Sequence, residues 1–191
     1  MVIKKNISLK PLNTFGMHVV AKEFASIESK QDLAKILKTN LSNLLVLGGG
    51  SNVLLTNDVD ALVLHINIKG IEVVSVYENN VRVRVAAGEN WHEFVSWCLD
   101  KNYGGVENLS LIPGNVGTAP IQNIGAYGVE LKDTFISCEA MNIQTQELRA
   151  FTKEECDFGY RNSIFKEELK GQYIITSVIF ELSSHQHTIK T

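Results

Sequence analysis

The chain has 191 residues, of which 45% are apolar, so it can bury a sizeable core without disulfide or metal staples. Its net charge of -3 excludes the broad basic surface of proteins that bind nucleic acid or anionic membranes. Cys98, Cys138 and Cys156 are far apart and odd in number, so we expect free, buried thiols in a reducing cytosol. The histidines are scattered, and no metal site is predicted.

The N-terminus is too short and too polar for a signal peptide. No run of about 18 apolar residues is present, so no segment is predicted to span a membrane. We therefore expect a soluble, cytoplasmic protein.

The first part of the chain predicts a helix and several strands. In residues 28–40, Leu33, Ile36 and Leu37 form one apolar face, and Ser29 with Asp32 provides a cap. Asn57-Asp58 predicts a turn between strands. The strands predicted here are a buried one at Leu44–Leu47, a short one at Leu54-Leu55 and a third at residues 62–68.

The second part predicts a strand-dominated unit with one helix. Ile71–Tyr77 and residues 81–86 form a hairpin, in which alternating valines face the core. Asn90 and Glu93 resemble a capping box for a helix. Its apolar stripe consists of Trp91, Phe94, Val95, Cys98 and Leu99. Further strands are predicted at residues 135–143, 148–151 and 173–182, with a short helical turn capped by Thr152 and Glu155.

This order predicts an α+β fold in two units. We expect a small α/β unit over residues 1–66 and a larger α+β unit over residues 67–191.

Two glycine-rich loops are candidates for ligand binding. Gly48-Gly49-Gly50-Ser51-Asn52 follows an apolar strand, and three glycines allow backbone N–H groups to converge on an anion. The loop lacks the Gly-x-Gly-x-x-Gly pattern of a Rossmann dinucleotide site and the lysine of a P-loop (Walker) site, so neither kind of nucleotide site is favoured. A sharp solvent-exposed turn is the alternative interpretation.

The second loop lies within residues 103–128, which are rich in glycine and proline and have little periodicity. Such a long irregular stretch inside a compact domain is usually functional. Small residues with isolated polar groups suit a flat aromatic ligand, although a loop that merely crosses the core is an equal alternative. The polar groups are those of Asn115, Thr118, Gln122, Asn123 and Tyr127.

Five motifs in order carry a family resemblance. They are Asn13-Thr14-Phe15-Gly16, Gly48-Gly49-Gly50-Ser51-Asn52, Ile112-Pro113-Gly114, Pro120-Ile121-Gln122-Asn123-Ile124-Gly125-Ala126-Tyr127-Gly128 and Tyr160-Arg161-Asn162-Ser163-Ile164-Phe165-Lys166. This series closely resembles the UDP-N-acetylenolpyruvoylglucosamine reductase family of peptidoglycan precursor synthesis, from Leu9 to Leu182.

The resemblance implies the FAD-binding fold shared with vanillyl-alcohol oxidase, in which two subdomains hold FAD non-covalently. Neither His65 nor any cysteine is a candidate for a covalent flavin link. The loop at residues 48–52 and the segment 113–118 would hold the diphosphate, and Gln122, Asn123 and Gly125 would lie near the flavin. The complete set of expected cofactor-binding residues is Gly48, Gly49, Gly50, Ser51, Asn52, Val53, Leu54, Pro113, Gly114, Gly117, Thr118, Ala119, Gln122, Asn123 and Gly125.

The resemblance also implies the reaction. NADPH gives hydride to the flavin, and the flavin then reduces the enolpyruvyl group of a UDP-sugar. Arg161 matches the catalytic arginine of the family, and a guanidinium is suited to stabilising charge on the substrate carboxylate. Tyr127 and Tyr160, together with Arg161, are the expected substrate-binding residues.

The family's proton donor, a serine or cysteine, and its catalytic glutamate lie downstream, in or after a third, substrate-binding domain. No residue before Thr191 matches either group, so we expect an N-terminal portion of a monomeric enzyme, inactive alone. Loss of the partner segment would expose a sheet edge or apolar surface and favour self-association. Two alternatives are an FAD-binding module without catalysis and an FAD oxidase acting on an alcohol or sugar acid.

Overall fold

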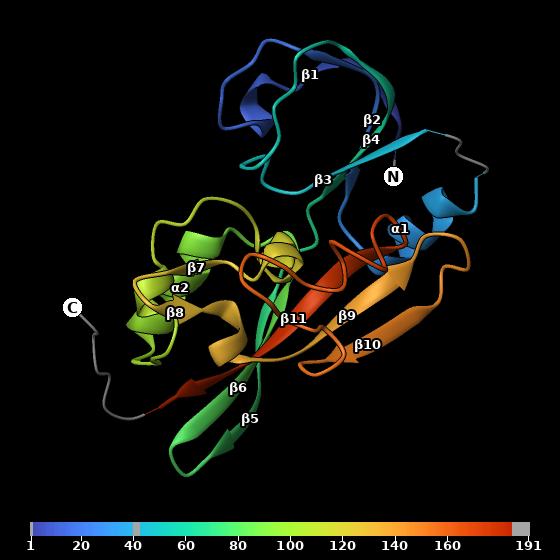
Figure 1. Ribbon diagram of the computed structural model, residues 1–191. Helices are drawn as coiled ribbons and strands as arrows, with labels where there is room; N and C mark the ends of the chain where they lie inside the picture. Colours follow the sequence, from blue (N-terminus) through green and yellow to red (C-terminus); the bar gives the residue numbers. More distant parts are fainter. Residues whose placement is uncertain (1, 40–42, 185–191) are drawn as a thin grey trace.

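The computed structural model describes residues 2–39 and 43–184, and in it each of two β-sheets forms the centre of one lobe (Figure 1). The four-stranded sheet of the first lobe has the order β1-β2-β4-β3. β1 pairs antiparallel with β2, whereas β2, β4 and β3 run parallel. The elements of this lobe are β1 (Lys4–Ser8), η1 (Lys10–Leu12), β2 (Val20–Ile27), α1 (Lys30–Leu37), β3 (Leu44–Leu47) and β4 (Val59–Ile66).

Helix α1 is the crossover from β2 to β3, two parallel strands of one sheet that lie on either side of β4. Ser29 is its N-cap, and the hydroxyl accepts a hydrogen bond from the Asp32 N–H at 3.0 Å. Leu33, Ile36 and Leu37 are buried, so the predicted helix, its cap and its apolar face are confirmed. The last predicted position of this helix, Asn40, lies outside the described residues.

Two strand predictions in the first lobe are wrong in part. Leu54-Leu55 is irregular chain, because two apolar residues are too few to indicate a strand, and the third strand begins at Val59. The strand at Leu44–Leu47 exists, but it lies at the edge of the sheet. Only Leu47 in it is buried, and Val46 is 39% exposed.

The second lobe contains a five-stranded antiparallel sheet in the order β10-β9-β11-β6-β5. The predicted hairpin and the three later strands are confirmed. The elements are β5 (Ile71–Tyr77), β6 (Asn80–Ala86), α2 (Trp91–Asp100), η2 (Glu107–Leu109), η3 (Val116–Thr118), η4 (Pro120–Gln122), β7 (Gly125–Ala126), β8 (Val129–Glu130), η5 (Leu131–Asp133), β9 (Phe135–Asn142), β10 (Leu148–Thr152) and β11 (Tyr173–Ser183).

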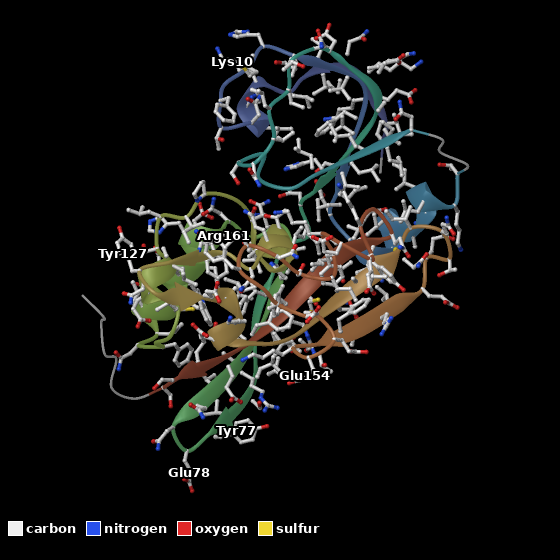
Figure 2. The ribbon with its side chains drawn as sticks, in the orientation of Figure 1. Lys10, Tyr77, Glu78, Tyr127, Glu154 and Arg161 are labelled. Atoms are coloured by element: carbon white, nitrogen blue, oxygen red, sulfur yellow. The ribbon has the colours of Figure 1, made fainter. Side chains whose placement is uncertain are left out.

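The β5–β6 hairpin carries Tyr77 and Glu78 at its tip, at the end of the second lobe remote from the first (Figure 2). β5 is an edge strand, and Val73, Val74 and Val76 on it are exposed.

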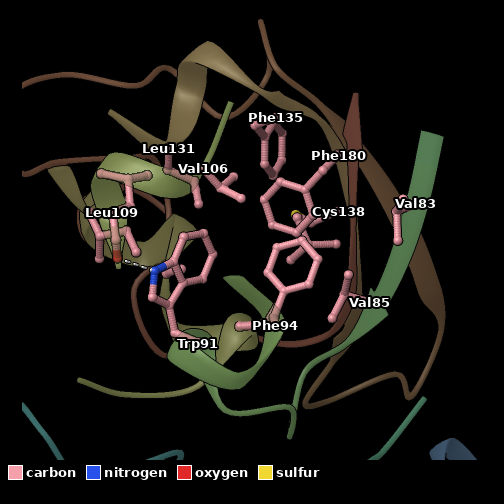
Figure 3. Packing of buried hydrophobic residues seen from close by; sticks show 14 of the residues in the cluster. Val83, Val85, Trp91, Phe94, Val106, Leu109, Leu131, Phe135, Cys138 and Phe180 are labelled. Atoms are coloured by element: carbon pink, nitrogen blue, oxygen red, sulfur yellow. Dashed lines mark hydrogen bonds between the residues drawn. The ribbon is translucent and has the colours of Figure 1, made fainter. Parts of the chain in front are cut away.

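The core of the second lobe is aromatic and lies between α2 and the sheet (Figure 3). The rings of Trp91, Phe94 and Phe180 contact one another, with centroids 5.0 to 5.9 Å apart. The Trp91 indole Nε1–H donates to Leu109 O at 2.7 Å. Asn90 caps α2 through its Oδ1, as predicted, but Leu99 is exposed and does not join the stripe.

The three cysteines are free and buried, as predicted. Burial raises the pKa of the Cys98 thiol well above its usual range, so this thiol stays protonated. Apolar side chains from both lobes share a second cluster, in which Ile66 of β4 and residues of α1 pack with Ala87, Met141 and Ile174 of the second lobe. This shared core orients the two lobes toward each other.

Candidate functional site

The first glycine loop follows β3 and meets the second loop at backbone distance. A Cβ built on Gly49 would lie 2.8 Å from Gly114 Cα and 2.9 Å from Asn115 Oδ1. Gly50 has φ +64°, and a side chain there would collide with Leu12 O. A side chain at Gly49 would push the two loops apart, and one at Gly50 would push the first loop away from η1, which explains why residues without a Cβ occupy these positions.

Polar side chains connect the two loops. Ser51 Oγ donates to Pro113 O at 3.1 Å, and Asn52 Nδ2 donates to Gln122 Oε1 at 2.9 Å. These bonds join positions of the first lobe to positions more than sixty residues later in the second. The two loops therefore form one wall of a cleft between the lobes.

The cavity beside these loops, which we call the loop cavity, has a volume of about 190 Å³. Its walls include ten of the residues predicted to bind the cofactor: residues 48–53, Pro113, Thr118, Ala119 and Gln122. The closely packed backbone and small hydroxyl and amide groups suit a diphosphate, which needs many donors at short range.

A second cavity of about 210 Å³, the apolar cavity, continues the cleft. Val46, Gly48, Thr118 and Ile121 line both cavities. The remaining walls are mainly apolar and come from both lobes, among them Ile66, Ile143, Phe165, Tyr173 and Ile174. This composition is that of a site for a flat ring system. Gly117, which was predicted to bind the cofactor, lines the apolar cavity, and a Cβ on it would collide with Ala87.

β7 and β8 form a two-residue hairpin whose turn is Tyr127-Gly128. Both residues have positive φ, +52° and +74°, which is the geometry of a type I′ turn. Tyr127 is unusual there because a bulky side chain disfavours positive φ, and the residue is 82% exposed. Strained positions of this kind are concentrated at ligand-binding sites.

Arg161 lies in a second tight turn, between Gly159 and Asn162, which form an antiparallel bridge. Its φ is +54°. The guanidinium Nη2 donates to Gly125 O at 2.6 Å, so the turn is attached to β7. Lys166 Nζ donates to the Arg161 carbonyl at 3.1 Å. Figure 2 shows Tyr127 and Arg161 on loops remote from the β5–β6 hairpin tip.

A third cavity, the arginine cavity, has a volume of about 470 Å³ and lies between these two turns. Gly125, Glu130, Lys132, Tyr160 and Arg161 are among its walls. Lys132 Nζ lies 2.6 Å from Glu130 Oε2, and this ion pair lowers the pKa of the Glu130 carboxyl and raises that of Lys132. Arg161 adds a second positive charge near Glu130 and Asp133 adds a second negative one, so the formal charges of the walls balance, and the Arg161 guanidinium is the wall group suited to an anionic ligand.

Four predicted residues do not belong to the walls of these cavities. Leu54 is 62% exposed, outside the loop cavity. Asn123 is fully buried, with its amide bonded to backbone groups of the protein. Tyr127 projects from the hairpin tip. Gly114 contributes through its contact with Gly49.

Several wall residues carried no sequence signal. Val46 is hidden in an ordinary strand pattern, and Trp91 was predicted as packing, although it also lines the loop cavity. Glu130 and Lys132 resemble ordinary surface charges. The Gly-rich stretch that ends at Gly128, just before Glu130 and Lys132, was the one sequence feature that could have indicated a site there.

The fold and the cleft define an α+β domain with a ligand-binding cleft between two lobes. A family model described as FAD binding domain matches residues 21–150. The chain therefore belongs to the FAD-binding domain family, and FAD is its cofactor. The cavity walls fit this group, because the glycine backbone and small hydroxyl groups of the loop cavity suit phosphate, and the apolar cavity suits a ring.

Individual proteins with similar sequences and structures are reductases and an oxidase. The chain is 57% identical, over its whole length, to UDP-N-acetylenolpyruvoylglucosamine reductase of Flavobacterium johnsoniae. A crystal structure of such a reductase, MurB, from Thermus caldophilus superposes with a TM-score of 0.78 at 25% identity and covers 95% of the chain. A solvent-stable cholesterol oxidase shares the fold, with a TM-score of 0.68 at 12% identity over 97% of the chain and 38% of the oxidase.

The chain spans 57% of the length of the Flavobacterium relative and 62% of the Thermus structure. The resemblance read from the five motifs and the predicted two-lobe FAD-binding fold are thus confirmed. Among the described residues, no helix is long and apolar enough to cross a membrane.

Proposed function

We propose that this chain is the FAD-binding portion of a cytoplasmic UDP-N-acetylenolpyruvoylglucosamine reductase, which uses NADPH to reduce the enolpyruvyl ether of a UDP-sugar. The observation that carries the proposal is the position of Arg161 in the wall of the arginine cavity, attached to the Gly-rich segment that also borders the FAD cleft. The 57% identity to a reductase of this name supports it.

FAD would be held without a covalent link. The backbone of residues 48–53 and 113–118 would bind the diphosphate, with Ser51 and Thr118 close by. The apolar cavity would take one of the planar rings. His65 and the three cysteines do not belong to the walls of either cavity in the described part of the chain, which supports non-covalent binding.

The chemistry that FAD supplies when bound is the storage of a hydride between NADPH and the vinyl carbon of the enolpyruvyl ether. As that carbon gains hydride, negative charge spreads onto the substrate carboxylate. The Arg161 guanidinium, always charged and rich in donors, would pair with this carboxylate in the transition state. Tyr160, on the same turn, would orient the substrate from the cavity wall.

The experiment is to add FAD to the purified chain, dialyse, and record the visible spectrum and the flavin fluorescence. We expect a retained flavin band with quenched fluorescence, and bleaching of that band by NADPH. A colourless protein would contradict the FAD site. The full-length gene product should then convert the enolpyruvyl sugar nucleotide to its lactyl ether. Retained FAD with no such turnover in the full-length protein would favour the alternative, an FAD-binding module without catalysis.

A further inference from the structure

The buried side chain of Asn123 lies at the junction of three segments around the arginine cavity. Its Nδ2 donates to Gly159 O at 3.0 Å, and its Oδ1 accepts from the Lys132 N–H at 3.1 Å. The partners, a carbonyl and an N–H, fix the orientation of the amide, since the flipped side chain would oppose like groups. The side chain is fully buried, so these bonds face no competition from water.

The Gly159 carbonyl that Asn123 binds belongs to the turn that carries Arg161. Gly159 O also accepts from the Asn162 N–H at 3.3 Å, and Gly159 N–H donates to Asn162 O at 3.1 Å. On the other side of this turn, the buried Ser163 donates its hydroxyl to Ile121 O at 2.7 Å. The turn is therefore anchored at both ends to the segment from Ile121 to Asn123.

Arg161 itself needs this anchoring. Its backbone has φ +54°, which disfavours a residue with a Cβ, and its side chain is exposed. Such a conformation persists when the surrounding structure over-determines it. Without its anchors the turn would relax and the guanidinium would leave Gly125 O.

We infer that Asn123 is a positioning residue, whose buried amide attaches the Gly159–Asn162 turn to η5, directly after the β7–β8 hairpin, and thereby holds the Arg161 guanidinium in the wall of the arginine cavity. This differs from the role of direct flavin contact expected from the family resemblance. The inference rests on the proposed function for the part of Arg161 in the reaction, and on contacts alone for the anchoring.

The test uses Asn123→Asp in the native full-length protein, because this change keeps the size and the acceptor for the Lys132 N–H but replaces the donor to Gly159 O. Trypsin cleaves after arginine, so the rate of cleavage between Arg161 and Asn162, measured by mass spectrometry, reports opening of the turn. We expect cleavage there to accelerate about tenfold, as the loss of one buried hydrogen bond implies. FAD affinity should stay within about twofold of wild type.

Asn142→Asp is the matched control. Asn142 uses only its Oδ1 in the bonds to the Gln144 and Thr145 N–H groups, so the same chemical change removes neither of these bonds. Cleavage after Arg161 should be unchanged in this variant. Unchanged cleavage in Asn123→Asp, or a large loss of FAD affinity without faster cleavage, would overturn the anchoring role. Asn123→Ala, which removes both bonds, should accelerate cleavage at least as much.

Turnover gives a second readout. If Asn123 acts through Arg161, the double variant Asn123→Asp/Arg161→Lys should be no slower than Arg161→Lys alone. Losses that multiply would assign Asn123 an independent role and overturn the inference. If the wild-type protein does not reduce the sugar nucleotide, the proposed function fails, while the cleavage assay still decides whether Asn123 anchors the turn.

Discussion

At the scale of single residues, the cleft depends on the absence of a side chain at Gly49. The two loops approach so closely here that a Cβ would contact the backbone of Gly114. An ordinary turn glycine such as Gly16, with φ +63°, has open space around the same position. The two glycines therefore serve different purposes, steric at Gly49 and conformational at Gly16.

We predict that Gly49→Ala lowers FAD affinity by about 5- to 150-fold, because overpacking costs about 1–3 kcal/mol and must separate the loops. Flavin fluorescence titration measures this. Gly16→Ala is the control: it strains the backbone without touching the second loop, and its FAD affinity should match that of the wild type. Equal affinities for all three proteins would contradict the diphosphate site.

Arg161 is predicted to contribute by its shape as well as its charge. Arg161→Lys keeps the positive charge but loses the planar donor pair, so turnover by the full-length protein should fall by about 10²-fold or more. Arg149→Lys is the matched control, since Arg149 forms an ion pair with Glu155 away from the cavity. An Arg161→Lys enzyme with near-normal turnover would remove the catalytic role.

At the scale of elements, a helix-capping motif begins a full helix only where the helix also packs on the core. Ser29 and Asn90 cap real helices. Thr152 and Glu155 also form the two reciprocal bonds of a capping box, at 2.8 and 3.3 Å, and the chain makes the predicted short turn, closed by the Cys156 N–H bond to Thr152 O at 3.0 Å, without continuing into a helix. A cap offsets part of the free energy needed to start a helix, but the helix extends only if an apolar face packs on the core.

Strand β4 carries a prediction about pH. His65 stacks on Phe24, with ring centroids 6.1 Å apart, and burial and then Lys69 lower the pKa of His65 below 6.5. Below pH 6.5 the unfolded chain therefore binds a proton that the folded chain rejects, and the free energy of unfolding should fall as the pH falls through this window. Denaturant unfolding between about pH 5 and 7.5 measures this.

His65→Gln should flatten that pH dependence, because glutamine does not titrate. The variant will be less stable at neutral pH if the stacking is lost, so the slope against pH, and not the absolute stability, is the readout. The same slope in the variant and the wild type would show that His65 is not the responsible group.

At the scale of the whole molecule, the cleft exists because the two lobes share an apolar cluster and meet at their glycine loops. Neither lobe contains a complete wall of the loop cavity or of the apolar cavity. A ligand bound there contacts both lobes, so it stabilises their docking as well as each lobe.

We therefore predict that FAD at about 100 times its Kd stabilises the protein by about 2.7 kcal/mol, which raises Tm by roughly 5–10 °C. Circular dichroism melting with and without FAD measures the shift. Riboflavin, which lacks the diphosphate and the adenine, should produce a much smaller shift at equal concentration. Equal shifts for the two ligands would place recognition in the ring alone and contradict the role of the glycine loops.

Sequence by itself determined the cofactor family, the order of most elements and the two glycine loops, because these depend on local periodicity and on short motifs of consecutive residues. Tertiary structure decided which residues form the walls: Val46 and Trp91 join the loop cavity, whereas Leu54 and the Asn123 side chain do not. Contacts such as those of Asn123 with Gly159 and Lys132 join distant segments, and no local pattern specifies which backbone group a buried amide will meet.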